Sequence, residues 1–291
     1  MLTRVPDRKK YVKTIAIASG KGGVGKTNVT ANLAIAMSKL GKKVLIVDAD
    51  LGLANVHILF NLAPTYNIQH VLSGERTLAE VLVEGPHGIR ILPAGGGVQE
   101  LTRLDEFQRL RLLEAFDAYE SDVDVLLIDT SAGISENVTF FCSAAQEIVI
   151  VTMPEPTAWL DAYQLIKVLH TDYQENRFHI LVNSATSKQD ADDAFLTLTR
   201  VSEKYLNIGL DYLGYLPLNS EVREAVRARR AFSDMFPKSF GAQCFREFAT
   251  ALLNRDERVK GTLQFFIGNL LASSADRKRL LPRNAGSTVE R

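Results

Sequence analysis

Short runs of Val, Ile and Leu alternate with longer amphipathic stretches along most of this chain. The apolar runs lie at 14–18, 44–47, 89–92, 123–128, 148–152, 178–182 and 211–216, and stretches with helical periodicity lie at 28–40, 107–119, 136–145, 158–173 and 190–205. Near-continuous apolar strands are buried on both faces, and strands that alternate with helices form βαβ units. The pattern therefore predicts an α/β fold of three layers, with helices on both faces of a mostly parallel sheet. No linker interrupts it, so we expect one domain over residues 1–253.

The composition excludes several classes of protein. Lys plus Arg and Asp plus Glu both number 34, so the net charge is zero, which argues against a surface that binds nucleic acid throughout. Cys142 and Cys244 lie in separate helix-like segments, so a disulfide scaffold or a zinc ribbon is not expected. No apolar run approaches the ~20 residues that span a bilayer, and no signal peptide follows the basic N-terminus. We therefore expect a cytoplasmic protein.

A glycine-rich loop joins the first expected strand to the first expected helix. Its sequence, GKGGVGKT at residues 20–27, fits G-x-x-x-x-G-K-[ST] in the strand–loop–helix context that this phosphate-binding motif requires. Lys26 can reach the β- and γ-phosphates, and the hydroxyl of Thr27 can bind Mg²⁺. The expected nucleotide contacts in this segment are Gly20, Lys21, Gly22, Gly23, Val24, Gly25, Lys26, Thr27 and Asn28.

Three aspartates follow two of the apolar strands: Asp48 and Asp50 after the second, and Asp129 after the fourth. In parallel sheets, ligands bind at this end of the strands. A carboxylate there can orient a metal-bound water, or the water that attacks the γ-phosphate. A single aspartate could equally cap the next helix, but three of them beside a phosphate loop favour a nucleotide site.

Lys21 is a second lysine near the start of the loop, and a lysine in that place is not needed to hold phosphate within one subunit. With it, the loop resembles that of the MinD/ParA deviant-Walker ATPases, whose motif is K-G-G-x-G-K-[ST]. The resemblance covers about residues 12–271. It implies the P-loop NTPase fold, the cofactors ATP and Mg²⁺, slow regulatory ATP hydrolysis, and an ATP-bound homodimer in which Lys21 reaches the partner's nucleotide.

The same resemblance implies roles for the acidic residues. Asp129 matches the Walker B aspartate, and Asp50 matches the residue that positions the attacking water. The implied metal ligands are Thr27, Asp129 and Asp48. The implied catalytic residues are Lys21, Lys26, Asp50 and Asp48.

Further nucleotide contacts are implied outside the phosphate loop. Asn55 shares a first switch segment with Asp48, and residues 130–133 match a second switch. In this family adenine contacts tend to come from an Asn after a late strand and from the loop after the last strand. Asn183 occupies the first place, and Pro217 with Asn219 occupies the second.

Four segments resemble the flagellar-number regulators FlhG/FleN in particular: 48–55 (DADLGLAN), 84–88 (EGPHG), 155–163 (EPTAWLDAY) and 263–271 (LQFFIGNLL). Such proteins restrict how many flagella a bacterium builds and where. They partner the GTPase FlhF and, in some bacteria, the transcription activator FleQ. The N-terminal residues lack the D-Q-A-x-x-L-R segment with which many FlhG proteins stimulate FlhF, which favours a role that opposes a transcription activator.

The end of the chain carries an apolar stripe at helical spacing: Val259, Leu263, Phe266, Ile267 and Leu270. Basic residues stand on both sides of it, which suits an anionic membrane, although a helix packed on the core would show the same spacing. The family also has a C-terminal membrane-targeting helix. We therefore expect residues 254–274 to form such a helix, docked on the core in the monomer, and residues 275–291 to be disordered. The protein would then bind the inner face of the cytoplasmic membrane reversibly.

Two alternatives remain open. A chromosome or plasmid partition ATPase of the same family would bind DNA nonspecifically when ATP is bound. A metabolic P-loop ligase or kinase would transfer phosphate to a small molecule. The arginines at 223, 227, 229 and 230 could contact DNA, but with zero net charge we interpret them as a solvated helix face and expect no direct DNA binding.

Overall fold

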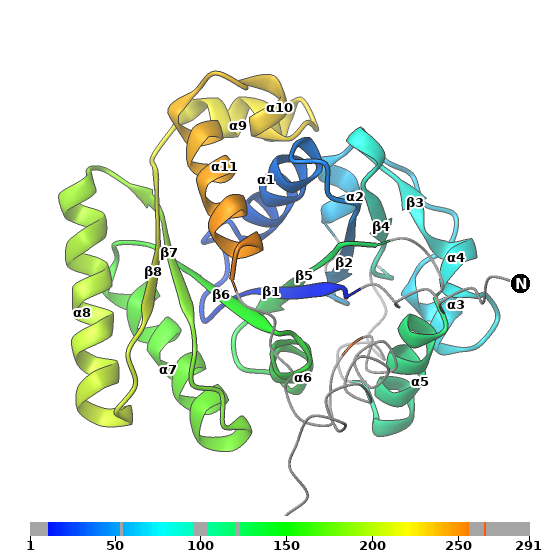
Figure 1. The fold of residues 1–291 in the computed structure, drawn as a ribbon, viewed down its shortest axis with the longest axis horizontal. Coiled ribbons are helices and arrows are strands. Elements are labelled where there is room, and N and C mark those ends of the chain that lie inside the picture. Colours follow the sequence, from blue (N-terminus) through cyan, green and yellow to red (C-terminus); the bar gives the residue numbers. More distant parts are fainter. Residues whose placement is uncertain (1–10, 53–54, 96–103, 120–122, 256–264, 266–291) are drawn as a thin grey trace, which may run out of the picture.

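An eight-stranded sheet runs through the middle of the molecule in the order β3-β4-β2-β5-β1-β6-β7-β8 (Figure 1). The computed structural model describes residues 11–52, 55–95, 104–119, 123–255 and 265. The strands are β1 (Lys13–Ser19), β2 (Val44–Ala49), β3 (Val83–Glu84), β4 (Arg90–Leu92), β5 (Val125–Ala132), β6 (Glu147–Thr152), β7 (His179–Ala185) and β8 (Asp211–Pro217). Neighbouring strands are parallel except for the short pair β3 and β4. The expected mostly parallel sheet is confirmed.

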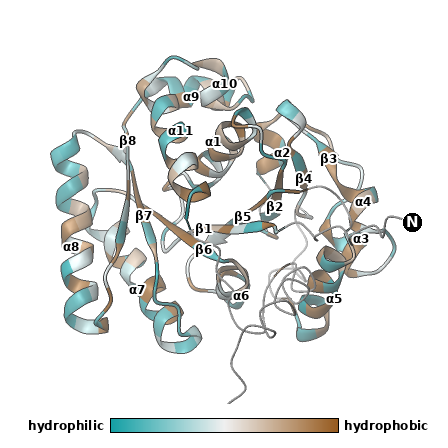
Figure 2. Ribbon diagram, viewed as in Figure 1, coloured by the Kyte–Doolittle hydropathy of each residue, from teal (hydrophilic) through white to brown (hydrophobic). Residues whose placement is uncertain are grey.

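Helices cover both faces of this sheet, as the buried apolar runs require. One face packs against α1 (Lys26–Lys39), α2 (Val56–Leu59), α9 (Ser220–Arg227), α10 (Phe232–Met235) and α11 (Phe240–Leu253). The other packs against α3 (Ile68–Leu72), α4 (Leu78–Val81), α5 (Glu106–Asp117), α6 (Glu136–Ala144), α7 (Pro156–Tyr173) and α8 (Lys188–Leu206). Figure 2 shows hydrophobic central strands and hydrophilic outer helix surfaces, α8 above all. The fold is the three-layer α/β architecture expected from the sequence.

One strand differs from its expected length in a way that matters for the site. The apolar run predicted a strand ending at residue 128, but β5 continues through polar residues to Ala132. It lies between β1 and β2, and both neighbours keep pairing with it: Asp48 is in register with Asp129, and Ser19 with Ala132. Asp129 therefore lies inside the sheet and not in a loop after it.

The structure says little about the expected C-terminal helix. Helix α11 ends at Leu253, and of the residues beyond it only Asn254, Arg255 and Phe265 are described. The predicted membrane-targeting helix at 254–274 and the tail at 275–291 therefore lie almost wholly outside the described residues. Among the helices that are described, none has both the length and the apolar character needed to cross a bilayer.

Candidate functional site

The phosphate loop connects the carboxyl end of β1 to the first turn of α1. Gly23 and Gly25 adopt φ angles of +82° and +94°, where a side chain would be strained. Gly25 is the residue just before α1, so the loop delivers its backbone N–H groups to the start of a 14-residue helix. The free N–H groups and the positive end of the helix dipole make this place suitable for phosphate.

Neighbouring strands and helices hold the loop in place. A side chain at Gly20 would clash with the backbone carbonyl of Asp161 on α7, so glycine is required for the close approach there. Asn183 on β7 donates a hydrogen bond from Nδ2 to the carbonyl oxygen of Val24, at 2.8 Å. The loop is therefore fixed by contacts from parts of the chain more than 130 residues away.

Lys26 is the residue whose ammonium group the motif directs at phosphate. Its side chain is buried, and its Nζ donates to the hydroxyl oxygen of Ser19 at 2.9 Å. Burial lowers the pKa of Lys26, while the carboxylates of Asp129 and Asp50 act in the opposite direction. Because burial disfavours the charged ammonium, an anionic ligand such as a nucleotide phosphate would stabilise Lys26 in its charged form.

Asp129 lies fully enclosed below the loop, with 1% of its surface exposed. Its carboxylate is hydrogen-bonded by the side chains of Thr27 and Thr30 on α1. Burial raises the pKa of Asp129 to about 6, although both hydroxyls and Lys26 favour its charged form. The parallel register between β2 and β5 brings Asp48 alongside it.

Asp48 organises the segment that follows β2. One carboxylate oxygen accepts the N–H of Asp50 at 3.3 Å, and the other accepts the N–H groups of Asn55 and Val56 at 3.0 and 3.1 Å. Burial, with the neighbouring carboxylate of Asp129, raises the pKa of Asp48 well above its usual range. Asp48 thus anchors the loop that carries Asp50, while its role toward Mg²⁺ stays a prediction.

Lys21 has partners within its own subunit. Its Nζ lies 3.0 Å from Oε2 of Glu155 and 2.9 Å from Oγ1 of Thr157, at the start of α7. Lys21 therefore has polar contacts inside its own subunit, while the expectation that it is not needed to hold phosphate there stays a prediction. A side chain this long reaches the α7 start easily, and sequence spacing gives no sign of that proximity. The cross-dimer role remains a prediction.

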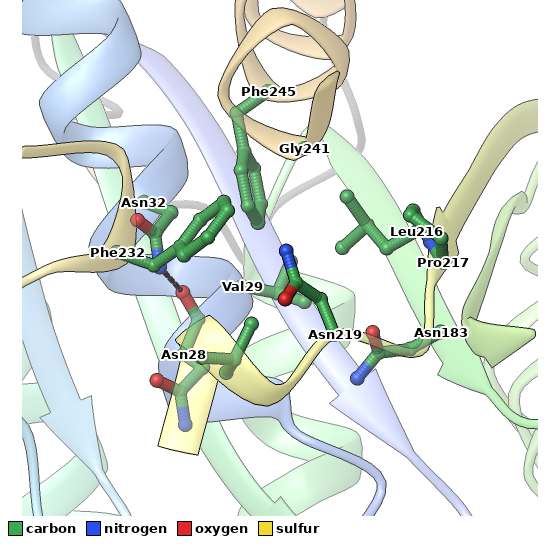
Figure 3. A pocket seen from close by; sticks show the side chains of 11 residues that line it. Asn28, Val29, Asn32, Asn183, Leu216, Pro217, Asn219, Phe232, Gly241 and Phe245 are labelled. Atoms are coloured by element: carbon green, nitrogen blue, oxygen red, sulfur yellow. Dashed lines mark hydrogen bonds between the residues drawn. The ribbon is translucent and has the colours of Figure 1, made fainter. Parts of the chain in front are cut away.

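A pocket opens beside the phosphate loop, between α1 and α11 (Figure 3). Its lining residues are Asn28, Val29, Asn32, Asn183, Leu216, Pro217, Asn219, Val222, Phe232, Gly241 and Phe245. Apolar side chains and amides surround the space, which suits a planar base that needs stacking and a few hydrogen bonds. Side-chain amides that line it also hold local structure: Asn32 donates to the carbonyl of Asn28, as Figure 3 shows, and Asn219 accepts the N–H of Glu221.

The structure places three of the expected nucleotide contacts in one pocket and another beside Asp48. Asn28, Asn183 and Pro217 line the same pocket, next to the phosphate loop. Asn55 is not among the residues that line this pocket; it lies at the start of α2, where its N–H donates to Asp48. Sequence reasoning missed Phe232 and Phe245, which come from the segments after the last strand. No motif or spacing marks those residues, because only the packing of α10 and α11 on α1 brings them to the pocket.

The residues present fit a magnesium nucleotide. The donors gathered around the loop are oxygens, namely the hydroxyl of Thr27 and the carboxylates of Asp129, Asp48 and Asp50, and oxygen is the ligand that Mg²⁺ prefers. The bound metal would neutralise phosphate charge, while the loop N–H groups and Lys26 would hold the phosphates. Residues that would hold ATP and could place a water beside its γ-phosphate fit phosphate hydrolysis.

Substituting Asp129 by Asn is expected to stabilise the nucleotide-free protein at pH 7.5. Because the pKa of Asp129 is about 6 when folded against an ordinary 3.8, the folded protein binds this proton more readily. Stability then falls as pH rises from about 4 to 6 and stays lower above that range. The difference corresponds to about 3 kcal/mol, which the neutral amide would largely recover. Urea unfolding at pH 7.5 and pH 5 measures it, and the gain should shrink at pH 5. A less stable variant at pH 7.5 would contradict this account.

Comparisons with known proteins agree with this geometry. The sequence pattern of the family described as "AAA domain" matches residues 12–181. The antiactivator FleN of Pseudomonas aeruginosa is 41% identical over 266 residues, which are 91% of this chain and 95% of FleN. The flagellum site-determining protein YlxH of Helicobacter pylori is 32% identical over 86% of this chain and 85% of its own length.

Solved structures of similar shape are MinD proteins. The MinC:MinD cell division complex of Aquifex aeolicus matches with a TM-score of 0.70 and 27% identity, over 87% of this chain and 100% of that one. MinD of Pyrococcus horikoshii, complexed with Mg-ADP, matches with a TM-score of 0.69 and 25% identity, over 83% and 96%. The family match over residues 12–181 spans the phosphate loop and the three carboxylates. The chain is therefore an ATPase of the MinD/ParA family, in the branch that contains FlhG and FleN.

Proposed function

We propose that this ATPase is a dimerising switch that regulates the number and placement of flagella. ATP with Mg²⁺ joins two subunits, and hydrolysis separates them. ATP turnover is slow, because the protein acts on its partners through its nucleotide-bound state and not through the product of hydrolysis. The observation that carries the proposal is a phosphate loop with Lys21 in a chain that is similar to the antiactivator FleN over 91% of its length.

The name of that relative favours one kind of partner. An antiactivator opposes a transcription activator, so we infer that this chain inhibits a FleQ-type activator of flagellar genes. The similarity to a flagellum site-determining protein supports a second interaction, with an FlhF-type GTPase that marks where the flagellum is built. The ATP-bound dimer is the form in which we expect both partners to be bound.

Deleting the gene and counting flagella per cell tests the proposal. We expect more flagella in the deletion strain, restored to the parental number by the parental gene but not by a gene encoding Lys26→Ala. Unchanged flagellation together with plasmid or chromosome loss would support a partition ATPase instead. Phosphate transfer from ATP to a small molecule would support a metabolic ligase or kinase.

We also propose that the C-terminal segment places the switch at an anionic membrane, and that the core holds this segment in the monomer. Phe265, which with Asn254 and Arg255 makes up the described part of this segment, is 1% exposed and packs against α5 and α6. Its ring centroid lies 5.0 Å from that of Phe116 and 6.2 Å from those of Phe140 and Phe141. Its N–H donates to the carbonyl oxygen of Ala144 at 3.4 Å.

The packing of Phe265 on the core makes Phe265 the residue to substitute in a test of docking. Helical spacing selects Phe266, Ile267 and Leu270 for the face that packs, and these residues lie outside the described part of the chain. Phe265, which falls off that stripe, is the residue whose burial is seen. A single aromatic side chain packed among other aromatic rings can hold the segment on the core. Once the segment is released, the apolar stripe beside Phe265 is free to bind lipid.

Phe265→Ala is expected to increase binding to anionic liposomes in the absence of ATP. Losing a buried Phe weakens docking by roughly 3 kcal/mol, which raises the released fraction on the order of 100-fold while release is rare. Liposome co-sedimentation measures the effect. The matched control is Phe107→Ala, because Phe107 on α5 is 64% exposed.

The same assay tests the coupling to nucleotide. The parental protein should bind liposomes better with ATP than with ADP, and Phe266→Glu should prevent binding without changing ATP affinity. Equal binding with both nucleotides would refute the coupling. Binding by a chain that ends at Leu253 would refute the C-terminal anchor.

A further inference from the structure

Thr30 is a completely buried threonine on α1 that no part of the phosphate motif includes. It lies three residues after Thr27, so both hydroxyl groups face the same side of the helix. Its exposed surface is 0%, and its Oγ1 lies 3.0 Å from Oδ1 of Asp129 on β5. The hydroxyl also lies 3.1 Å from the backbone oxygen of Lys26, one turn earlier.

We propose that Thr30 is a positioning residue for the magnesium centre, which orients the carboxylate of Asp129 without touching the metal or the nucleotide. The hydroxyl has one hydrogen to donate and two acceptors in reach. A carboxylate accepts more strongly than a backbone carbonyl, so the hydrogen goes to Asp129. The carbonyl of Lys26 is the alternative acceptor within the same turn.

The role follows from what the two threonines can each do. Thr27 and Thr30 both hydrogen-bond Asp129, but Thr27 is itself an expected ligand of Mg²⁺. Thr30 is the donor on α1 that has no expected contact with the metal. It therefore acts on Mg²⁺ only through the direction in which it holds the Asp129 carboxylate. Partners of this kind, one step removed from a metal, commonly change metal affinity 10- to 100-fold when they are removed.

Removing the hydroxyl is expected to raise the Mg²⁺ concentration that nucleotide binding requires. The probe is a fluorescent ADP analogue, titrated against the full-length protein over a series of Mg²⁺ concentrations and in EDTA. Thr30→Val keeps the shape of the side chain and should need about 10- to 100-fold more Mg²⁺ for half-maximal binding. Binding in EDTA should match the parental protein, because the loop and Lys26 are unchanged. Thr30→Ser retains the donor and should stay within a few-fold of the parent.

A matched variant separates this role from a general effect of core substitution. Thr152 at the end of β6 is also 0% exposed, and among the described residues its hydroxyl has no hydrogen-bond partner. Thr152→Val should therefore leave the Mg²⁺ requirement unchanged. Thr30→Ala provides a second removal of the hydroxyl if the valine variant folds poorly, since Ala suits a helix interior.

Three outcomes would overturn the proposal. The first is a parental Mg²⁺ requirement in folded Thr30→Val or Thr30→Ala. The second is an equal loss of binding in EDTA, which would mean that Thr30 only supports the loop. The third is a parental protein whose nucleotide binding ignores Mg²⁺, which would remove the metal site of Thr27 and Asp129 along with the role of Thr30.

Discussion

Replacing Lys21 with Ala is expected to abolish ATP-dependent dimerisation and ATP hydrolysis while the fold stays intact. In the proposed dimer this ammonium reaches the partner's nucleotide, so each subunit loses one contact to the nucleotide across the interface. Analytical ultracentrifugation with ADP and with ATP measures the change. Lys42→Ala is a suitable control, because that exposed lysine lies between α1 and β2, away from the phosphate loop.

The contact of Lys21 with Glu155 does not prevent this role. The two side chains are 37% and 50% exposed, and exposed ion pairs contribute at most about 1 kcal/mol. Lys21 can therefore leave Glu155 and Thr157 at little cost when a second subunit presents a phosphate. An equally stable ATP-bound dimer in Lys21→Ala would show that the lysine acts only within its own subunit.

Replacing Asp50 with Ala is expected to stop turnover and preserve ATP binding and the dimer. Asp50 follows β2 on the loop that Asp48 anchors, and it is close enough to Lys26 to influence its pKa. A carboxylate there can position the attacking water but is not needed to hold phosphate. Losing such a group lowers hydrolysis by at least about 100-fold.

Phosphate release and nucleotide binding, measured on the same preparation, separate the two effects for Asp50→Ala. The control is Asp172→Ala, which removes an exposed carboxylate near the end of α7. The variant should accumulate as an ATP-bound dimer. Hydrolysis near the parental rate would exclude Asp50 as the catalytic residue.

Local sequence was enough for the fold class and for the phosphate loop. Seven apolar runs and five stretches of helical periodicity predicted the central strands and the helices α1, α5, α6, α7 and α8, which was enough to predict the layers, although the 14-residue helix α11 was not among them. The loop is contiguous, and its glycines are required by positive φ angles at Gly23 and Gly25. Structural features that depend only on residues close together in the sequence can therefore be predicted from the sequence.

The length of β5 and the contacts of three aromatic side chains could not be predicted from local sequence. β5 continues past its apolar run because β1 and β2 on either side offer hydrogen bonds to its polar residues. Phe232 and Phe245 line the pocket together with residues of α1, and Phe265 packs between α5 and α6, although α1, α5 and α6 lie far from these aromatic residues in the sequence. Such contacts depend on how helices dock, which periodicity does not specify.

The charged residues of the site also show which features the sequence determines and which depend on tertiary packing. The sequence by itself determined that Lys26, Asp48 and Asp129 would meet at the carboxyl end of a parallel sheet, because Asp48 and Asp129 stand at the ends of apolar strands and Lys26 ends the glycine-rich loop after the first strand. Only the tertiary structure decided that Asp48 binds three backbone N–H groups, that Lys21 rests on Glu155, and that Thr30 holds Asp129. A hydrogen bond requires two atoms within about 3 Å. The sequence specifies which donors and acceptors the protein has, and tertiary packing specifies which of them come within hydrogen-bonding distance.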